Sequence, residues 1–154
     1  MTWIDAVAPG TTLPAHFDGC FACGEVESGL GLRSTIGEGL SLTATFTVGS
    51  AHQGARGIAH GGLIATAFDE ALGALQVLVG ERAVTASLQT EFRRPVPVGS
   101  VLHFTCRIDR REGRKLWTSG DARLGGPDGP IAAQANALFV VVPNEHFTTH
   151  GSPR

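Results

Sequence analysis

Residues 60–80 read HGGLIATAFDEALGALQVLVG, and this stretch holds the longest helical pattern in the sequence. From Leu63 to Val79 the apolar residues recur at helical spacing and form a wide stripe. The remaining face is narrow and carries small and polar residues, with Asp69 in its middle. Gly80 is placed to end the helix. A helix with so wide an apolar stripe must be covered by other elements of the fold.

Strands are predicted on both sides of this helix. Residues 40–48 alternate apolar and polar side chains with a period of two, and residues 30–36 are expected to pair with them through a turn at 37–39. Val84, Ala86, Leu88 and Phe92 are expected to share the apolar face of the first strand after the helix. Four strands in meander order are expected there, at residues 83–93, 101–111, 114–124 and 131–142.

The order of these elements predicts an α+β fold in which a curved antiparallel sheet wraps around one central helix, the hot-dog fold. With 154 residues the chain is long enough for one well-packed domain, and no internal repeat indicates a second. We expect residues 30–142 to form this domain. Residues 1–29 are expected to be a loop segment packed on it, and residues 143–154 a frayed tail.

Composition limits the classes of partner. A formal net charge of −2 gives no reason to expect nucleic acid or an anionic membrane. The apolar stretches read as too short and too interrupted to span a bilayer, and residues 1–5 show no secretory signal. The chain has three cysteines, an odd number, which argues against a disulfide scaffold. We therefore expect the reducing cytoplasm as its location. No cofactor is expected.

The helix start is a candidate for stabilising negative charge. Gly61 and Gly62 leave backbone N–H groups sterically open where the helix dipole is positive, which suits a developing oxyanion. Asp69 follows Gly61 by eight residues, a rise of roughly 12 Å. An oxyanion donor and a base must each lie within about 3 Å of the reacting atoms. If both serve one thioester, they must come from two chains, so we expect a homodimer, with a dimer of dimers as a further possibility.

Two hydroxyls are placed to assist Asp69. Thr85 lies on the polar face of the next strand, where it could hold a water or position the carboxylate. Thr66 lies three residues before Asp69 on the same helical face and could do similar work.

The motifs in this region resemble those of PaaI-type hot-dog thioesterases, and most of all the THEM4- and THEM5-like branch. The resemblance runs from about Cys20 to Val142. It rests on Cys20-Phe21-Ala22-Cys23-Gly24, on His60-Gly61-Gly62 with an acid nine residues after the histidine, and on a hydroxyl sixteen residues beyond that acid.

This resemblance implies hydrolysis of a fatty or aromatic acyl-CoA to the free acid and CoA. The Gly61 N–H would bind the thioester oxygen, and His60 would orient that turn or the substrate. Asp69 would be the general base or the nucleophile, and Thr85 would help to place the attacking water.

Other residues are implied as contacts to the substrate. Gly62 and Thr66 share the small polar face of the helix, and Arg93 and Arg94 match a basic strand end that could contact CoA phosphates. Many PaaI-type relatives carry asparagine six residues before the histidine, whereas this chain has Gly54. Either Gly61 then binds the oxyanion alone, or the site is weaker than theirs.

The pair Cys20 and Cys23 has a metal-ligand spacing, with His16 four residues upstream, but the sequence shows no fourth ligand and His52 would be a guess. We therefore interpret the pair as a structural turn and expect no metal. Glu70 is about 100° around the helix from Asp69 and is interpreted as a structural or interface residue, the acid only if Asp69 is not.

Two further functions are weighed against hydrolysis. A non-catalytic acyl-CoA sensor or carrier would need neither the acid nor the hydroxyl at this spacing. A hydratase or dehydratase would need a histidine and an acid facing each other across the site, which His60 and Asp69 on one helix do not obviously provide.

Overall fold

A computed structural model of the chain describes residues 8–151. Its strands and helices follow the predicted order closely, with most boundaries within a few residues of the pattern. The elements are β1 (Arg33–Ile36), β2 (Ser41–Thr47), the 3-10 turn η2 (Ser50–His52), α1 (Gly61–Ala74), the 3-10 segment η3 (Leu75–Val79), β3 (Ala83–Phe92), β4 (Val101–Glu112), β5 (Lys115–Leu124), β6 (Ile131–Val141) and α2 (Glu145–His150).

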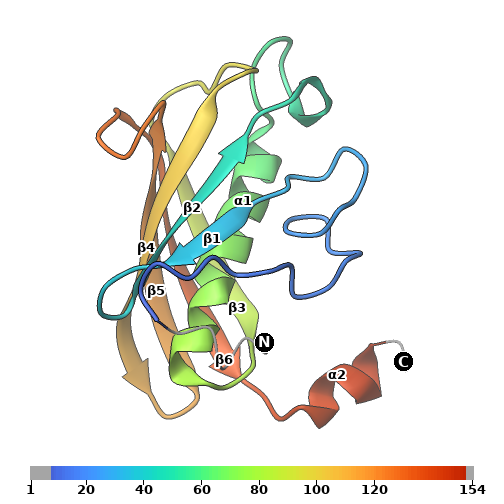
Figure 1. Cartoon of the computed structure of the whole chain (residues 1–154), viewed down its shortest axis with the longest axis vertical. Coiled ribbons are helices and arrows are strands. Elements are labelled where there is room, and N and C mark those ends of the chain that lie inside the picture. Colours follow the sequence, from blue (N-terminus) through green and yellow to red (C-terminus); the bar gives the residue numbers. More distant parts are fainter. Residues whose placement is uncertain (1–7, 152–154) are drawn as a thin grey trace.

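One six-stranded sheet forms the body of the molecule, and α1 lies along its inner face (Figure 1). All of its strand pairs are antiparallel, and their order is β1-β2-β4-β5-β6-β3. The prediction of an α+β hot-dog fold is therefore confirmed. The sheet curves around the helix because its apolar inner face can only be buried against the apolar stripe of α1.

The position of β3 corrects the predicted meander. β3 does not pair with β4, which follows it in the chain, but lies at the far edge of the sheet beside β6. The reason is that both edges of β4 are taken, one by β2 and one by β5 through the tight turn at residues 113–114. The segment 93–100, which contains Pro95 and Pro97, carries the chain from one place to the other.

The apolar stripe of α1 is buried as predicted. Ala67, Phe68, Ala71 and Leu72 are almost completely shielded from solvent, and the Phe68 ring meets Phe104 of β4 edge-on at 5.0 Å between centroids. The 19-residue stretch 61–79 is nonetheless long and apolar enough to cross a membrane by length and composition, which corrects the expectation that no stretch is. Its burial against the sheet accounts for that composition as a core helix.

The helix ends as Gly80 predicts, although its last turn is tighter than expected. The chain passes from α1 into η3 at Leu75 and then reverses at Gly80, whose φ of 68° is the left-handed conformation that glycine adopts without strain. The Gln76 side chain accepts a hydrogen bond from the Ala83 N–H and so connects this turn to the start of β3.

A bulge in β3 changes which side chains face the helix. Thr85 pairs with Phe139, but the next pair is Ser87 with Leu138, so the alternation shifts at Ala86. Side chains opposite each other on neighbouring strands share a face, so Thr85 lies on the inner face together with Leu88 and Phe92. The prediction that Ala86, Leu88 and Phe92 form one uninterrupted face with Val84 is therefore wrong.

The segment after Pro143 is ordered over part of its length. Instead of a frayed tail, residues 145–150 form the short helix α2. The Arg82 guanidinium lies over the Phe147 ring at 4.2 Å from its centroid, and the Arg82 carbonyl accepts from the Val142 N–H. These contacts hold the segment at the end of the sheet where β3 begins.

Replacing Phe68 by alanine tests the role of α1 as the core element. The ring is fully buried, so its loss should lower the free energy of unfolding by about 3–5 kcal/mol, measured by urea denaturation followed by tryptophan fluorescence. Phe92→Ala is the matched control, because that ring is 53% exposed and its loss should cost less than about 1 kcal/mol. Equal costs for the two variants would contradict this packing.

Candidate active site

His60 caps the first turn of α1. The ring Nδ1 of His60 accepts a hydrogen bond of 2.9 Å from the Gly62 N–H, and the backbone N–H of His60 donates to the His52 carbonyl at 2.8 Å. The Gly62 N–H is therefore already used within the chain. The Gly61 N–H, the first of the helix, has no acceptor within residues 8–151 and points outward from the helix end. Of the two predicted donors, Gly61 is the one that remains available.

Two glycines keep this turn open. A Cβ on Gly61 would lie 3.3 Å from the ring of Phe92, and a Cβ on Gly54 would lie 3.0 Å from the Cα of His60. Gly54 therefore packs directly against the cap residue, at the position where many PaaI-type relatives carry asparagine. A side chain at Gly54 would require His60 to move by a few tenths of an ångström.

Asp69 and Thr85 meet as the sequence predicted. The Thr85 hydroxyl donates to Asp69 Oδ1 at 2.6 Å, which connects the middle of α1 to the bulged part of β3. No other residue of the described chain bonds to this carboxylate, so Oδ2 is left for another partner. Thr66, the second candidate hydroxyl, instead donates to the Gly62 carbonyl at 2.9 Å and does not contact Asp69.

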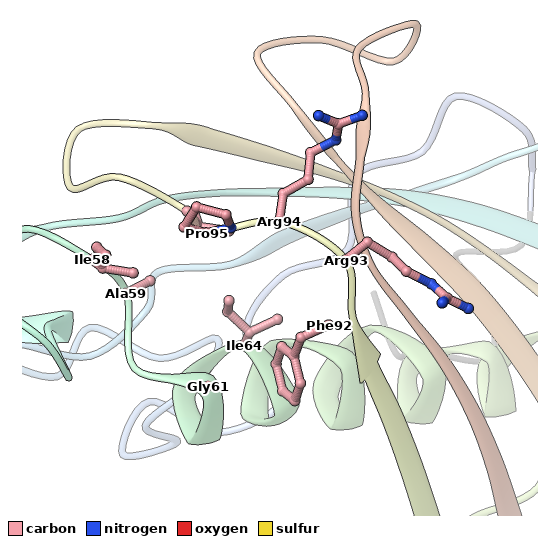
Figure 2. Close-up of a pocket in the computed structure, with 9 residues that line it drawn as sticks. Ile58, Ala59, Gly61, Ile64, Phe92, Arg93, Arg94 and Pro95 are labelled. Atoms are coloured by element: carbon pink, nitrogen blue, oxygen red, sulfur yellow. The ribbon is translucent and has the colours of Figure 1, made fainter.

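A cavity of about 380 Å³ opens at the start of α1 (Figure 2). Gly61 and Ile64 contribute one wall and Phe92 another, while Arg93 and Arg94 lie at its rim. The sequence pattern did not single out Ile58, Phe92 or Val96 as pocket residues. Ile58 and Val96 lie in loops without a periodic pattern, and an apolar residue looks the same in sequence whether it lines a core or a cavity. None of the nine described lining residues is acidic: Ile58, Ala59, Gly61, Ile64, Phe92, Arg93, Arg94, Pro95 and Val96.

The two arginines differ in how they are held. Arg93 pairs with the Glu91 carboxylate, and Arg94 donates through Nε to the Ile131 carbonyl at 3.2 Å. Both side chains are exposed and extend away from the backbone of the segment after β3.

Gly61 and Asp69 are not brought together within one chain. They lie eight residues apart on the same regular helix, and Asp69 does not line the cavity that contains Gly61. The cavity therefore has an N–H donor and two cations but no base of its own.

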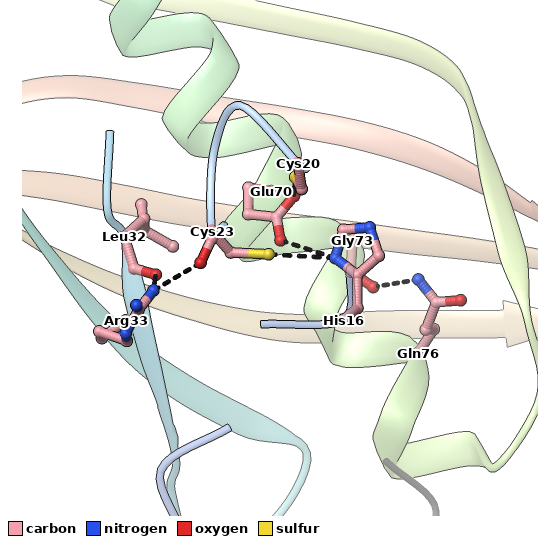
Figure 3. A network of polar contacts seen from close by, with 8 residues as sticks. All are labelled: His16, Cys20, Cys23, Leu32, Arg33, Glu70, Gly73 and Gln76. Carbon is pink, nitrogen blue, oxygen red and sulfur yellow. Dashed lines mark hydrogen bonds and ion pairs between the residues drawn. The ribbon is translucent and has the colours of Figure 1, made fainter. Parts of the chain in front are cut away.

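A second polar cluster lies on another side of α1 (Figure 3). Cys23 Sγ is 3.1 Å from His16 Nδ1, and the Glu70 carboxylate contacts both His16, at 3.4 Å, and Cys20, at 3.8 Å. Burial, reinforced by Glu70, raises the pKa of the Cys23 thiol far above its usual range. Burial would also raise the pKa of the Glu70 carboxyl, but its contacts with His16 and the cysteines outweigh that effect and lower it.

His52 is not part of this cluster and contacts other loops. It is buried, its Nδ1 accepts from the Gly49 N–H, and its Nε2 lies 3.0 Å from the Ser28 carbonyl. It therefore connects the loop before β1 to the loop that carries His60, and its role is structural.

The chain is similar to known proteins in sequence and in fold. Residues 56–128 match the family described as the thioesterase superfamily. Over 126 residues the chain is 35% identical to acyl-coenzyme A thioesterase THEM4 of Bos taurus, an alignment that covers 80% of this chain and 52% of that protein. The chain thus spans about half the length of the curated relatives it matches.

Solved structures share the fold. The E. coli PaaI protein from the phenylacetic acid degradation operon superposes with a TM-score of 0.68 at 18% identity, covering 74% of this chain and 81% of that one. The smu.793 protein of Streptococcus mutans, solved with acetyl CoA bound, superposes with a TM-score of 0.65 at 20% identity, covering 71% and 86%. The chain is thus similar to the thioesterase superfamily over residues 56–128, and it shares the hot-dog fold of these solved structures.

Proposed function

We propose that this protein hydrolyses an acyl-CoA thioester to a carboxylic acid and CoA, at a site completed by two copies of the chain. The observation that carries the proposal is the separation of two half-sites on α1. One half is the cavity with the open Gly61 N–H, and the other is the Asp69 carboxylate held by Thr85. Neither half is sufficient for acyl transfer alone.

The edge of the sheet supplies a way to join the halves. β3 is a ten-residue edge strand with one side unpaired, and such edges favour pairing with another chain. Phe92, at one end of β3, touches Gly61, and Thr85, near the other end, bonds to Asp69. Antiparallel pairing of two β3 strands about a two-fold axis at Gln89 would place Thr85 of the partner subunit opposite Phe92, because the bulge at Ala86 adds one residue between Thr85 and the axis.

That pairing brings Asp69 of the partner subunit toward the Gly61 cavity. The Gly61 N–H would bind the thioester oxygen and stabilise the negative charge that develops on it. The carboxylate would accept a proton from the attacking water, or attack the acyl carbon itself, and the Thr85 hydroxyl would hold it in position. On the first route the CoA thiolate leaves, takes up the proton that the carboxylate accepted, and the acid forms in the same step. On the second route the departure of CoA leaves an anhydride on Asp69, which water then hydrolyses to the acid and the free carboxylate.

The remaining candidates fit roles in substrate binding. Arg93 and Arg94 at the rim suit the phosphates of CoA, because guanidinium groups pair well with phosphate oxygens. The apolar wall formed by Ile64 and Phe92 suits the acyl group. The THEM4 relative, named an acyl-coenzyme A thioesterase, and the similarly folded S. mutans protein with bound acetyl CoA support the same ligand class.

Asp69→Asn keeps the shape of the side chain and removes its charge. We expect free-thiol release from acyl-CoA, followed with a thiol reagent across short, long and aromatic acyl groups, to fall by about 10²–10⁴-fold. Circular dichroism and the oligomeric mass should stay unchanged. Asp109→Asn, at a surface ion pair with Arg107, is the matched control and should keep full activity. A folded Asp69→Asn protein with wild-type turnover would exclude this carboxylate from the reaction.

Thr85→Val and Thr85→Ser separate the hydroxyl from the shape of the side chain. The valine variant loses the 2.6 Å bond to Asp69, and a hydrogen bond to a charged group is worth about 1.5–3 kcal/mol, so kcat should fall by roughly 10- to 100-fold. Thr85→Ser keeps the donor and should retain most of kcat, with KM little changed in both. If valine and serine reduce kcat equally, the hydroxyl does not position the carboxylate.

A further inference from the structure

Four potential metal ligands converge between the N-terminal loop and α1. His16, Cys20 and Cys23 come from the loop and Glu70 comes from the helix, and one donor atom from each lies within 4.8 Å of the other three. The sequence offered only three of these residues as a group, because Glu70 is 50 positions from Cys20 in the chain. The fourth ligand that the sequence did not reveal is therefore present in the fold (Figure 3).

The distances match a tetrahedral site. Donors bonded to one zinc ion at about 2.0–2.3 Å in tetrahedral geometry lie roughly 3.3–3.8 Å from one another. The three printed separations are 3.1 Å from His16 Nδ1 to Cys23 Sγ, 3.4 Å from His16 Nδ1 to Glu70 Oε1, and 3.8 Å from Cys20 Sγ to Glu70 Oε2. These three separations, two of which involve different oxygens of Glu70, are close to tetrahedral values, and one donor atom from each residue lies within 4.8 Å of the others.

The loop is built to hold both sulfurs on one side. The Gly24 N–H donates to the Cys20 carbonyl at 2.8 Å and closes a turn around the two cysteines. A Cβ on Gly24 would lie 2.2 Å from the Asp18 carbonyl oxygen, so only glycine fits there. Arg33 donates to the Cys23 carbonyl at 2.6 Å and fixes the turn against the start of β1. Backbone contacts of this kind orient metal ligands from outside the coordination sphere.

Glu70 reaches the cluster because its side chain leaves α1 on a different side from that of Asp69. It follows Asp69 directly on α1, so the two carboxylates differ by about 100° around the helix axis. Asp69 faces Thr85, whereas the Glu70 side chain is only 16% exposed and lies under the loop. A buried carboxylate beside two thiols gains little from their weak S–H donors, but it gains a strong partner in a cation.

We propose that His16, Cys20, Cys23 and Glu70 bind one zinc ion, which fastens the N-terminal loop to α1. Two sulfur donors, an imidazole and one carboxylate favour zinc over magnesium or calcium, and four protein ligands make the site structural. Its position on α1, about 100° around the helix from the side that meets Thr85, gives it the role of holding α1 and the loop in one arrangement. It does not depend on the proposed hydrolysis.

Metal content tests the site directly. The protein is purified under reducing conditions, loaded with zinc and separated from free metal. Inductively coupled plasma mass spectrometry should then find about one zinc ion per chain. Cobalt in its place should give thiolate-to-metal charge-transfer absorption and the intense visible bands of tetrahedral cobalt. A Cys20→Ser, Cys23→Ser double variant should lose both signals, and Glu70→Gln should weaken zinc binding by roughly 10- to 100-fold or more.

Because a variant can fail to fold, the second measurement uses the wild-type chain and follows the alkylation of its cysteines. Zinc should shield Cys20 and Cys23 from alkylation, measured peptide by peptide. Cys106 is the internal control, because it is fully buried and burial raises the pKa of its thiol to about 12, so zinc should not change its slow reaction. Less than about a tenth of an ion per chain after loading, cobalt spectra without thiolate bands, or equal alkylation of both cysteines with and without zinc would each overturn the proposal.

Discussion

The rigid geometry of α1 is the constraint on which the rest of the site depends. A regular helix fixes the rise between Gly61 and Asp69 at roughly 12 Å, and the burial of Phe68 and Leu72 against the sheet leaves the helix no freedom to bend the two closer. The core that makes the domain stable therefore also keeps Gly61 and Asp69 apart. In the proposed function, a second copy of the chain brings the oxyanion donor and the base together.

The helix serves different partners on its different sides. One side is buried in the curved sheet, the side with Asp69 meets β3, and Glu70 reaches the N-terminal loop. The bulge at Ala86 matters here, because it places Thr85 on the inner face, within reach of the carboxylate, while Phe92 still reaches Gly61 from the same face. A single edge strand thus contacts both half-sites, which is why pairing along that strand would join them.

The fold could be predicted from sequence where the signal is local, and not where it depends on neighbours in space. The apolar stripe after Leu63 and the stop at Gly80 were sufficient for the helix. The edge position of β3 was missed, because alternation in a strand does not say which strand lies beside it. Asp69 and Thr85 could be singled out from the helix and strand patterns and from the resemblance to PaaI-type thioesterases, whereas Glu70 could only be joined to Cys20 and Cys23 by the tertiary structure.

Complementation between two inactive variants measures the sharing of the site most directly. Gly61→Pro removes the N–H at the first helical position, where proline fits. The preceding residue, His60, already has the extended backbone that a following proline requires (φ −66°, ψ 129°). Asp69→Asn removes the base. Co-expressed with different tags, the two should form mixed dimers with one intact site each, giving about a quarter of wild-type activity in an unfractionated mixture. Mixed dimers that form but recover no activity would contradict a site shared by two chains.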